Sequence, residues 1–347
     1  MKENTELKRL IKDYSQKVDF SGVIYVKQED RVLLSEAFGN ANRAEYLPNN
    51  VHTRFGIASG CKLFTAIGIG QLVESGVIAF DTPIAKCLEI NFPYFDEGVT
   101  IHHLLTHTSG IPDYFDEEVM TDYEDLWKDR PVYQMKSLID FLPLFQHQKM
   151  KFNPGETFHY NNAGYILLGL IIEQHTGKRF TDYMEEEIFQ KIGMKGSGYY
   201  SLDQLPQNTA MGYIDNKESG GWKTNIYSIP AKGGADGGAF VTAPDMITVW
   251  EALFKYQLLT EEMTSTLLQP HVHVNGEINY GYGIWMNQRK DHIYKYHVMG
   301  YDPGVRFRAV YYPDSQLKLA VPSNQECELF ELVQMIEESF LKEGGIL

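Results

Sequence analysis

The stretch FGIASGCKLFTAIGIGQLVESG, residues 55–76, predicts a buried helix that begins near Ser59. Its side chains are apolar on nearly every face after Lys62, and Gly76 stands where a glycine commonly ends a helix. Because Ser59 and Lys62 are three residues apart, their side chains should lie one above the other on the same face of the first turn. We therefore expect a hydroxyl and an amine to meet at the N-terminal end of this helix.

That pair has the parts needed for nucleophilic catalysis. A serine hydroxyl attacks only when a neighbouring group takes its proton, and Lys62 can do so if burial disfavours the ammonium form. Unpaired N–H groups at the start of the helix would favour negative charge near Ser59. The alternative is that Ser59 only caps the helix and Lys62 reaches the surface. Spacing does not decide, because 315–318 and 339–342 repeat it, so only the apolar context favours Ser59.

Charge and composition narrow the class of protein. The 347 residues include 31 basic and 46 acidic ones, which gives a net charge of −15, and 43% of the residues are hydrophobic. Such a composition is typical of a globular protein of about two domains. The acidic excess opposes binding to phosphate backbones and anionic bilayers. We expect a small-molecule substrate, no nucleic-acid partner, no cofactor and, without a long apolar run, no membrane span.

The N-terminus and the cysteines predict a compartment. The first twenty residues alternate charged and apolar side chains and do not form a secretory signal. Three cysteines, Cys61, Cys87 and Cys327, are too few for a disulfide framework and fit a reducing environment. These features predict a cytoplasmic protein. Cys61 is itself a possible thiol nucleophile, although a small buried cysteine on a helix more often serves packing.

Strands are expected at both ends of the chain, with helices and loops between them. Residues 22–26 and 32–38 near the N-terminus, and 293–298, 305–312 and 317–322 near the C-terminus, read as strands, with helices expected at 6–16 and 328–342. The fold class predicted is α/β of the α+β kind: an antiparallel sheet built from both chain ends, flanked by helices, with an inserted mostly helical domain. We expect residues 1–85 and 236–347 to form the sheet domain and 86–235 the insertion, with the active site between them.

A second apolar helix, 163–173, is expected to end at Gly177 and follows Tyr160-Asn161-Asn162. The simpler interpretation is that the asparagines cap the helix while Tyr160 packs at the edge of the core. The functional alternative is that Tyr160 shuttles a proton and Asn162 donates a hydrogen bond from its amide. The residues alone leave both open.

Two other patterns suggest ligand sites and are better explained otherwise. His103 and His107 have the i, i+4 spacing of two metal ligands, but no third ligand follows from the spacing. We expect their ring N–H groups to hold a loop in place, and we expect no metal. The glycine-rich run 232–239 lacks the Gly-Lys-Ser/Thr ending of a phosphate loop. It predicts a tight crossing of two backbone segments.

Four segments, 59–66, 101–110, 154–165 and 191–194, resemble in this order the serine β-lactamase-like family. The nearest branch holds class C β-lactamases, D-alanyl carboxypeptidases, penicillin-binding proteins and related esterases, and the resemblance runs from about residue 20 to 324. It implies a β-lactamase/transpeptidase-like fold and an acyl-enzyme mechanism. Ser59 would be the nucleophile, Lys62 and Tyr160 would share the proton transfers, and Asn162 would hold Lys62 and the substrate amide.

The third motif of that family is altered in this chain. The family pattern is a cationic residue, a small or hydroxyl residue and a glycine, followed shortly by Pro-Gly. Counting back from Pro-Gly at 303–304 aligns Val298-Met299-Gly300 with these three positions. His297 lies one residue before the position that the cationic residue takes in the family. Gly300 fits, so the N–H groups of Ser59 and Tyr301 would form the oxyanion hole. A substrate carboxylate would lack the cation that the family provides.

The function predicted is that of a serine acyl hydrolase, β-lactamase-like or penicillin-binding protein-like, acting on a small ester, amide or β-lactam. The alternative is a catalytically idle binding protein that keeps the pocket for a peptide or a cell-wall fragment. The Ser59 and Tyr160 motifs favour the enzyme, and the altered third motif favours the alternative. Because burying an unpaired carboxylate is costly, we expect neutral esters to be better substrates than penicillins.

Overall fold

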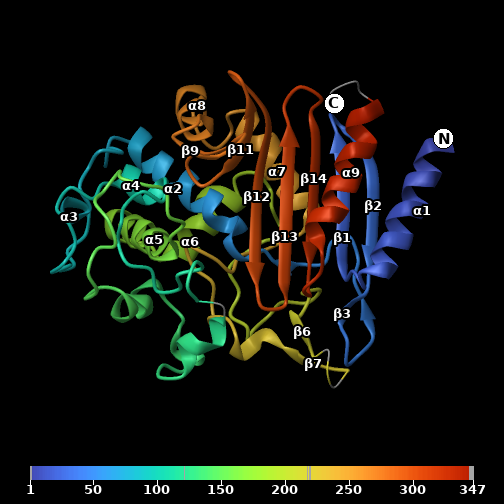
Figure 1. The fold of residues 1–347 in the computed structure, drawn as a ribbon, viewed down its shortest axis with the longest axis horizontal. Helices are drawn as coiled ribbons and strands as arrows, with labels where there is room; N and C mark the ends of the chain where they lie inside the picture. The colour runs from blue at the N-terminus through green and yellow to red at the C-terminus, as the bar shows by residue number, and fades with distance from the viewer. Residues whose placement is uncertain (1, 121, 217, 219, 344–347) are drawn as a thin grey trace.

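The computed structural model describes residues 2–120, 122–216, 218 and 220–343. Its largest element is an eight-stranded sheet with the strand order β2-β1-β14-β13-β12-β11-β10-β9 (Figure 1). The strands are β1 (Gly22–Gln28), β2 (Arg31–Phe38), β9 (Val272–Asn275), β10 (Ile278–Tyr280), β11 (Trp285–Arg289), β12 (His292–Asp302), β13 (Val305–Tyr312) and β14 (Leu317–Ser323). Every neighbouring pair is antiparallel.

The two ends of the chain meet inside this sheet. Strand β1 pairs with β14, with Tyr25 opposite Ala320, so an N-terminal and a C-terminal segment lie side by side. The predicted α/β fold with an antiparallel sheet built from both chain ends is therefore confirmed. Three further strands, β9 to β11, extend the sheet beyond β12 and were not among the predicted elements.

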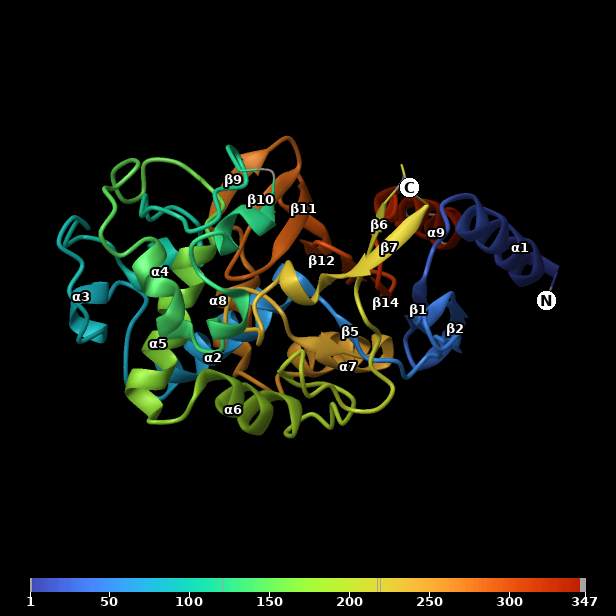
Figure 2. The same ribbon diagram turned by 90° about the horizontal axis from the view of Figure 1, so that it is seen from below.

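Helices cover both faces of the sheet (Figure 2). The sheet lies between two hydrophobic clusters. On one face lie α1 (Lys2–Lys17) and α9 (Leu329–Glu343), where Ile11 and Leu332 pack against Val310 of β13. On the other face lie α2 (Lys62–Glu74) and α7 (Ala243–Phe254). Because β13 and β14 are covered on both faces, their side chains are buried along almost their whole length.

Helix α2 is buried on every side, as its apolar sequence predicts. It packs against α5 (Asn162–Thr176) and α8 (Glu261–Leu268), and a Cβ atom at Gly68 would lie 3.0 Å from the side chain of Ile172. Positive φ values of 73° at Gly76 and 67° at Gly177 follow the ends of α2 and α5, which confirms both predicted stops. A single 3-10 turn, η1 (Ala58–Cys61), precedes α2 and carries Ser59.

The remaining elements are short. The α-helices are α3 (Ile84–Cys87), α4 (Ile101–Leu105) and α6 (Phe180–Met184), and the two-stranded pairs are β3 (Asn40–Asn42) with β4 (Leu47–Pro48), β5 (Phe55–Gly56) with β8 (Phe240–Val241), and β6 (Tyr213–Asn216) with β7 (Gly221–Thr224). Single 3-10 segments are η2 (Tyr123–Trp127), η3 (Val132–Gln134), η4 (Leu138–Leu144) and η6 (Asn225–Tyr227), and η5 (Glu185–Phe189) is a π-helical turn.

The division into a sheet domain and an inserted domain at 86–235 stays a prediction. One hydrophobic cluster joins α2 and α5 to the inner face of the sheet, so the two parts share a continuous core. Within the described ranges, no helix is both long enough and apolar enough to cross a membrane.

Candidate active site

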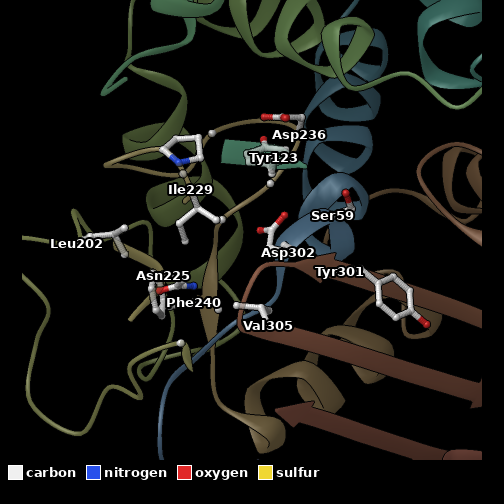
Figure 3. Close-up of a pocket in the computed structure, with 18 of the residues that line it drawn as sticks. Ser59, Tyr123, Leu202, Asn225, Ile229, Asp236, Phe240, Tyr301, Asp302 and Val305 are labelled. Atoms are coloured by element: carbon white, nitrogen blue, oxygen red, sulfur yellow. The ribbon is translucent and has the colours of Figure 1, made fainter. Parts of the chain in front are cut away.

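Ser59 lies in a strained turn at the edge of a cavity. The preceding residue, Ala58, has a φ of 44°, a left-handed conformation that costs a residue other than glycine on the order of 1–3 kcal/mol. Hydrogen bonds on both sides hold the turn: Ile57 N donates to Ala239 O at 3.0 Å, and Gly238 N donates to Ala58 O at 3.3 Å. Strain of this kind persists only where the surroundings enforce it, and here it presents the Ser59 hydroxyl to the cavity (Figure 3).

Lys62 is buried, with 2% of its surface exposed, and its amine has three oxygen neighbours. Its Nζ lies 2.9 Å from Ser59 Oγ, 2.8 Å from Asn162 Oδ1 and 2.6 Å from the main-chain oxygen of Asp236. A neutral amine has two N–H groups and one lone pair, so it can donate to Asn162 and Asp236 and accept from the Ser59 hydroxyl. Among the described residues no carboxylate lies within 4.0 Å of this Nζ, so moving a proton between Ser59 and Lys62 breaks no ion pair.

The two asparagines before α5 have separate roles. Asn161 caps the helix, because its side chain accepts a hydrogen bond from Gly164 N at 2.7 Å. Asn162 begins the helix and turns its Oδ1 toward Lys62. The capping interpretation is therefore correct for Asn161, whereas the side chain of Asn162 contacts the Lys62 amine beside Ser59. Its amide oxygen accepts from the amine, the reverse of the donation expected from the sequence.

Asp113, which the sequence did not single out, fixes Asn162. Its carboxylate accepts the N–H of Asn162 at 2.8 Å and the N–H of Ala163 at 2.9 Å, and Asn162 Nδ2 donates to Phe115 O at 3.3 Å. The Asn162 amide is thus held with its oxygen toward Lys62. Burial raises the pKa of Asp113 to about 7, although these two main-chain hydrogen bonds lower it.

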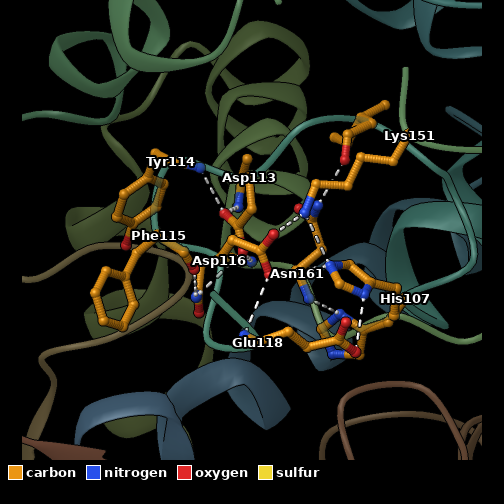
Figure 4. Close-up of polar contacts among 12 residues, drawn as sticks. His107, Asp113, Tyr114, Phe115, Asp116, Glu118, Lys151 and Asn161 are labelled. Carbon is orange, nitrogen blue, oxygen red and sulfur yellow. Dashed lines mark hydrogen bonds and ion pairs between the residues drawn. The ribbon is translucent and has the colours of Figure 1, made fainter. Parts of the chain in front are cut away.

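Asp113 also begins a loop rich in acidic residues, 113–118, whose polar contacts Figure 4 shows and which contributes to the lining of the cavity. Asp116 forms an ion pair with Lys151 and lies 3.2 Å from Nε2 of His159. The loop is therefore tied to the segment before α5 at two points. This attachment places Tyr114 and Phe115 in the wall of the cavity.

Tyr160 lies against the same amine. The centre of its ring is 4.9 Å from Lys62 Nζ, and the rings of His107 and Trp285 pack on it with centroid distances of 4.3 and 6.3 Å. Burial and the Glu117 carboxylate raise the pKa of Tyr160 well above its ordinary value, and a hydrogen bond with Ser59 lowers it only in part. Tyr160 is therefore a neutral phenol at neutral pH, able to donate a proton or pass one on.

His103 and His107 hold loops rather than a shared ligand. His103 Nδ1 accepts the N–H of Thr100 at 3.2 Å at the start of α4, and His107 Nδ1 accepts the N–H of Asn161 at 3.0 Å. Both Nδ1 atoms accept, whereas Nε2 of His107 lies 3.1 Å from the Tyr280 hydroxyl, to which the remaining ring N–H can donate. Burial lowers the pKa of His107 well below its ordinary value, so its ring is neutral. Within the described residues no group of three or more His, Cys, Asp or Glu side chains could hold a metal.

The glycine-rich run is the predicted backbone crossing. A Cβ atom at Gly233 would lie 2.3 Å from the main-chain oxygen of Gly238, so only glycine fits. Thr65 Oγ1 donates to Ala235 O at 2.6 Å, which ties this run to α2 and brings the Asp236 carbonyl to Lys62. The sequence signal was available, because Asp236 is the acidic residue inside a run of glycine and alanine.

Cys61 takes no part in this arrangement. Its side chain is fully buried, and its Sγ lies 3.7 Å from Gly234 O. Burial raises the pKa of the thiol to about 12, so the nucleophilic thiolate is not populated at neutral pH.

Gly300 and Tyr301, at the end of the altered third motif, lie beside the Ser59 turn. A Cβ atom at Gly300 would lie 2.0 Å from Ile57 O, so β12 passes directly beside the Ser59 turn and requires glycine there. Tyr301 lines the cavity while its ring points away from it (Figure 3). Strand β11 begins opposite His297, so within the described chain no strand pairs with that edge of β12 beyond this point.

The other residues of the motif do not line the cavity. Val298 is 2% exposed and packs in the core, and Met299 lies outside the cavity lining. His297 is 3% exposed beside Trp285, and burial together with the Arg308 charge lowers its pKa well below the ordinary value. Arg308 itself packs against Phe330, so it does not supply the missing cation.

The cavity beside Ser59 has a volume of about 240 Å³, and its wall combines apolar and aromatic side chains with polar groups. The charged residues in its lining are Glu117, Lys232, Asp236 and Asp302. Lys232 directs its Nζ to Thr181 Oγ1 at 3.3 Å, and the Asp236 carboxylate accepts from Tyr114. Asp302 was not among the predicted site residues, because its only sequence signal is its place just before Pro303.

Comparisons with known proteins agree with this geometry. The family model described as Beta-lactamase matches residues 7–333. Penicillin-binding protein 4* of Bacillus subtilis (strain 168) is 30% identical over 344 residues, which cover 94% of this chain and 73% of that protein. Esterase EstB of Burkholderia gladioli is 30% identical over 200 residues, which cover 56% of this chain and 50% of the esterase. A penicillin binding protein from Bacillus halodurans is 53% identical, with a TM-score of 0.91 over 94% of this chain and 99% of that one.

Proposed function

This chain belongs to the Beta-lactamase family, and from that premise we propose that it is a serine acyl hydrolase acting on a small ester, amide or β-lactam. One observation carries the proposal. The Ser59 hydroxyl lies 2.9 Å from a buried amine whose other two acceptors are neutral oxygens. This arrangement leaves Lys62 able to take a proton from Ser59 without leaving a carboxylate unpaired.

Ser59 Oγ attacks the carbonyl carbon of the substrate and passes its proton to Lys62. The resulting tetrahedral oxyanion collapses to an acyl-enzyme as the leaving group departs with a proton delivered through the neutral phenol of Tyr160. Water then attacks the acyl carbon as Lys62 takes its proton, and the acid product leaves as Lys62 returns that proton to Ser59 Oγ. Asn162 holds the Lys62 amine in position throughout, which supports the role that the sequence gave it.

The oxyanion hole is proposed to consist of the N–H groups of Ser59 and Tyr301. The proposal rests on the close passage of β12 beside the Ser59 turn, which Gly300 permits, and on the unpaired edge of β12 at this point. The Tyr301 ring points away from the cavity, so its main chain is the part available to a substrate.

A free carboxylate on the substrate is disfavoured at the third motif. Val298 and Met299 offer no cation there, and Arg306 directs Nη1 to the main-chain oxygens of Asp302 and Val305. An anionic group would therefore lose its hydration without gaining a partner. We propose that neutral esters and amides are turned over better than penicillins.

The proposal includes the position of the site. We propose that the active site lies between the sheet domain, 1–85 with 236–347, and the inserted domain, 86–235.

The alternative function is that of a binding protein without turnover, and only the apolar Val298 and Met299 favour it. The polar contacts at Lys62 argue against it, because a mere binding pocket has no need of a buried amine beside a hydroxyl.

Hydrolysis of p-nitrophenyl acetate and butanoate tests the proposal. We expect Ser59→Ala to lower kcat/KM by at least about 10³-fold, to the level of non-specific ester cleavage, because the nucleophile is gone. Ser315→Ala, which removes the serine of a second Ser-x-x-Lys sequence, is the matched control and should retain the full rate. Full activity in Ser59→Ala would overturn the assignment. No turnover of any ester, amide or β-lactam by the unaltered protein would favour the binding protein.

A further inference from the structure

Asp302, the last residue of β12, places its carboxylate in the cavity below Ser59 (Figure 3). Among the described residues, none forms a hydrogen bond or an ion pair with this carboxylate. The neighbouring cation, Arg306, donates from Nη1 to the main-chain oxygen of Asp302 at 3.0 Å and to Val305 O at 2.9 Å. Its charge is thereby directed at carbonyl groups and not at the Asp302 side chain.

The other charged groups around the cavity are already occupied or lie at its rim. The Asp236 carboxylate accepts from Tyr114, the Lys232 amine contacts Thr181, and Glu117 is exposed to solvent. Lys62 binds three oxygens on the far side of Ser59. Among the described residues, Glu117 and Asp302 are thus the lining carboxylates without a partner, and of these two Asp302 is the one shielded from solvent.

The surroundings of Asp302 make an incoming cation favourable. An unpaired carboxylate in a partly apolar cavity is penalised, and a positively charged ligand removes that penalty. The wall nearby is aromatic: the rings of Phe115 and Tyr123 meet at a centroid distance of 4.5 Å, and Asp302 is the carboxylate that most strongly raises the pKa of Tyr123. Aromatic faces attract cations, particularly quaternary ammonium groups.

We propose that Asp302 binds an ammonium group on the acyl part of the substrate, so that this enzyme selects cationic acyl donors over neutral and anionic ones. The inference rests on the proposed acyl hydrolase function and adds the charge class of its substrate. Asp302 acts on specificity, while Ser59 and Lys62 carry out the chemistry.

The test compares p-nitrophenyl esters whose acyl chains end in a trimethylammonium group, in the isosteric tert-butyl group or in a carboxylate, each joined by three or by five methylenes. We expect kcat/KM in the order cationic, neutral, anionic for at least one chain length. Asp302→Asn, which keeps the size of the side chain, should lower the cationic-to-neutral ratio by about 10-fold or more. Dividing the ratio of the variant by that of the unaltered protein cancels any intrinsic difference between the esters.

Glu117→Gln is the matched control, because it also removes one lining carboxylate but at the exposed rim. Its effect on the ratio should be clearly smaller, since water screens that charge. Equal effects of Glu117→Gln and Asp302→Asn would show that the overall negative potential of the cavity sets the preference for cations. Such a result would contradict a specific contact at Asp302.

The pH dependence gives a second readout. Burial, Asp236 and Glu117 raise the pKa of Asp302 and Lys62 and Arg306 lower it, with a net value of about 7. The carboxylate is charged above that pH and neutral below it, so the cationic-to-neutral ratio should rise as pH increases through about 7. The trimethylammonium group does not titrate, and the Asp302→Asn ratio should stay flat.

The possible failures are distinguishable. If no ester of the panel is hydrolysed, the proposed function fails. If the neutral or anionic esters are hydrolysed as well as the cationic ones, or if the ratio is unchanged in Asp302→Asn, the function stands and the inference about charge is wrong.

Discussion

Ser59–Lys62 and Ser315–Lys318 share one sequence spacing and both contain a buried lysine, but the two amines have different partners. Lys62 and Lys318 are 2% and 5% exposed. Lys62 binds three neutral oxygens, whereas Lys318 lies 3.1 Å from the carboxylate of Glu251. A carboxylate holds an amine in its ammonium form, whereas neutral oxygens permit either form. The same buried residue type is therefore an ion-pair partner in one place and a candidate base in the other.

The backbone explains why only one pair meets. Ser59 and Lys62 belong to a 3-10 turn that continues into α2, where side chains three residues apart share a face. Ser315 lies in the turn between β13 and β14, and Lys318 lies on β14, where side chains alternate between faces. Ser315 accepts from Leu317 N at 3.4 Å and Lys318 turns to Glu251. Whether a Ser-x-x-Lys spacing brings the hydroxyl and the amine together therefore depends on the secondary structure in which it occurs.

Of the substitutions that distinguish the Ser59–Lys62 region from the Ser315–Lys318 region, Lys62→Arg should have the largest effect on activity. Arginine keeps the charge but does not give up a proton, so we expect kcat/KM for a neutral ester to fall by about 10³–10⁴-fold. Lys318→Arg is the matched control and should keep full activity, because Glu251 can pair with either side chain. Steady-state rates and thermal unfolding of both variants check this, and near-normal turnover in a folded Lys62→Arg protein would refute the role of Lys62 as base.

A smaller loss is expected from Tyr160→Phe. Removing the phenol takes away the proposed relay while Lys62 remains, so kcat should fall by about 10²-fold. Tyr165→Phe serves as the control, since the Tyr165 ring is also close to Lys62 Nζ, at 5.4 Å, but its hydroxyl donates to Leu105 O. Equal losses of kcat in the two variants would indicate a packing role for Tyr160.

Asp113→Asn should lower kcat by roughly 10-fold with little change in KM, because Asp113 positions Asn162 and does not touch the substrate. Asp116→Asn, which alters the same loop at its ion pair with Lys151, is the control and should keep kcat. A loss confined to KM would mean that Asp113 shapes the binding site and does not position Asn162.

The raised pKa of Asp113 also predicts a pH effect on stability. The group titrates near 7 in the folded chain and at its usual, lower pKa in the unfolded chain, so between about pH 4 and 7 the folded state binds more protons. Its contribution therefore makes the free energy of unfolding fall as pH rises through that window. Chemical denaturation of Asp113→Asn and of the unaltered protein at several pH values measures the difference, and a constant difference would contradict the shift.

The smallest effect on activity is expected on the Ser315–Lys318 side. Glu251→Gln removes the partner of Lys318 and of Lys27, which lies 2.7 Å from the same carboxylate. We expect a loss of about 1–3 kcal/mol in the free energy of unfolding and unchanged kcat/KM. A large loss of activity at equal stability would show that this region is coupled to the site.

The sequence predicted those parts whose signal is local. The apolar run after Lys62, the stop at Gly177 and the strands of β13 and β14 all follow from periodicity and turn residues, and the structure confirms them. Strands β9 to β11 were missed because they are short and carry polar residues on an edge that stays partly exposed. A short strand with such a pattern resembles a loop until its neighbours are known.

The carboxylates of the site could not be predicted for a different reason. Asp113, Asp236 and Asp302 come from the acidic loop, the glycine-rich run and the end of β12, and only the folded topology brings them together. Asp113 meets Asn162 across 49 residues of sequence, and the Asp236 carbonyl meets Lys62 across 174. The motif at Ser59 could be recognised because all of its chemistry lies within one turn.

The most direct test of the central claim is the mass of the intact protein after reaction with a fluorophosphonate, followed by peptide mapping of the modified residue. The account predicts one adduct, located at Ser59, that is absent in Ser59→Ala and unchanged in Ser315→Ala, because only the first serine has a neighbouring amine able to accept its proton. An adduct that persists in Ser59→Ala, or that maps to Ser315 or Cys61, would contradict it.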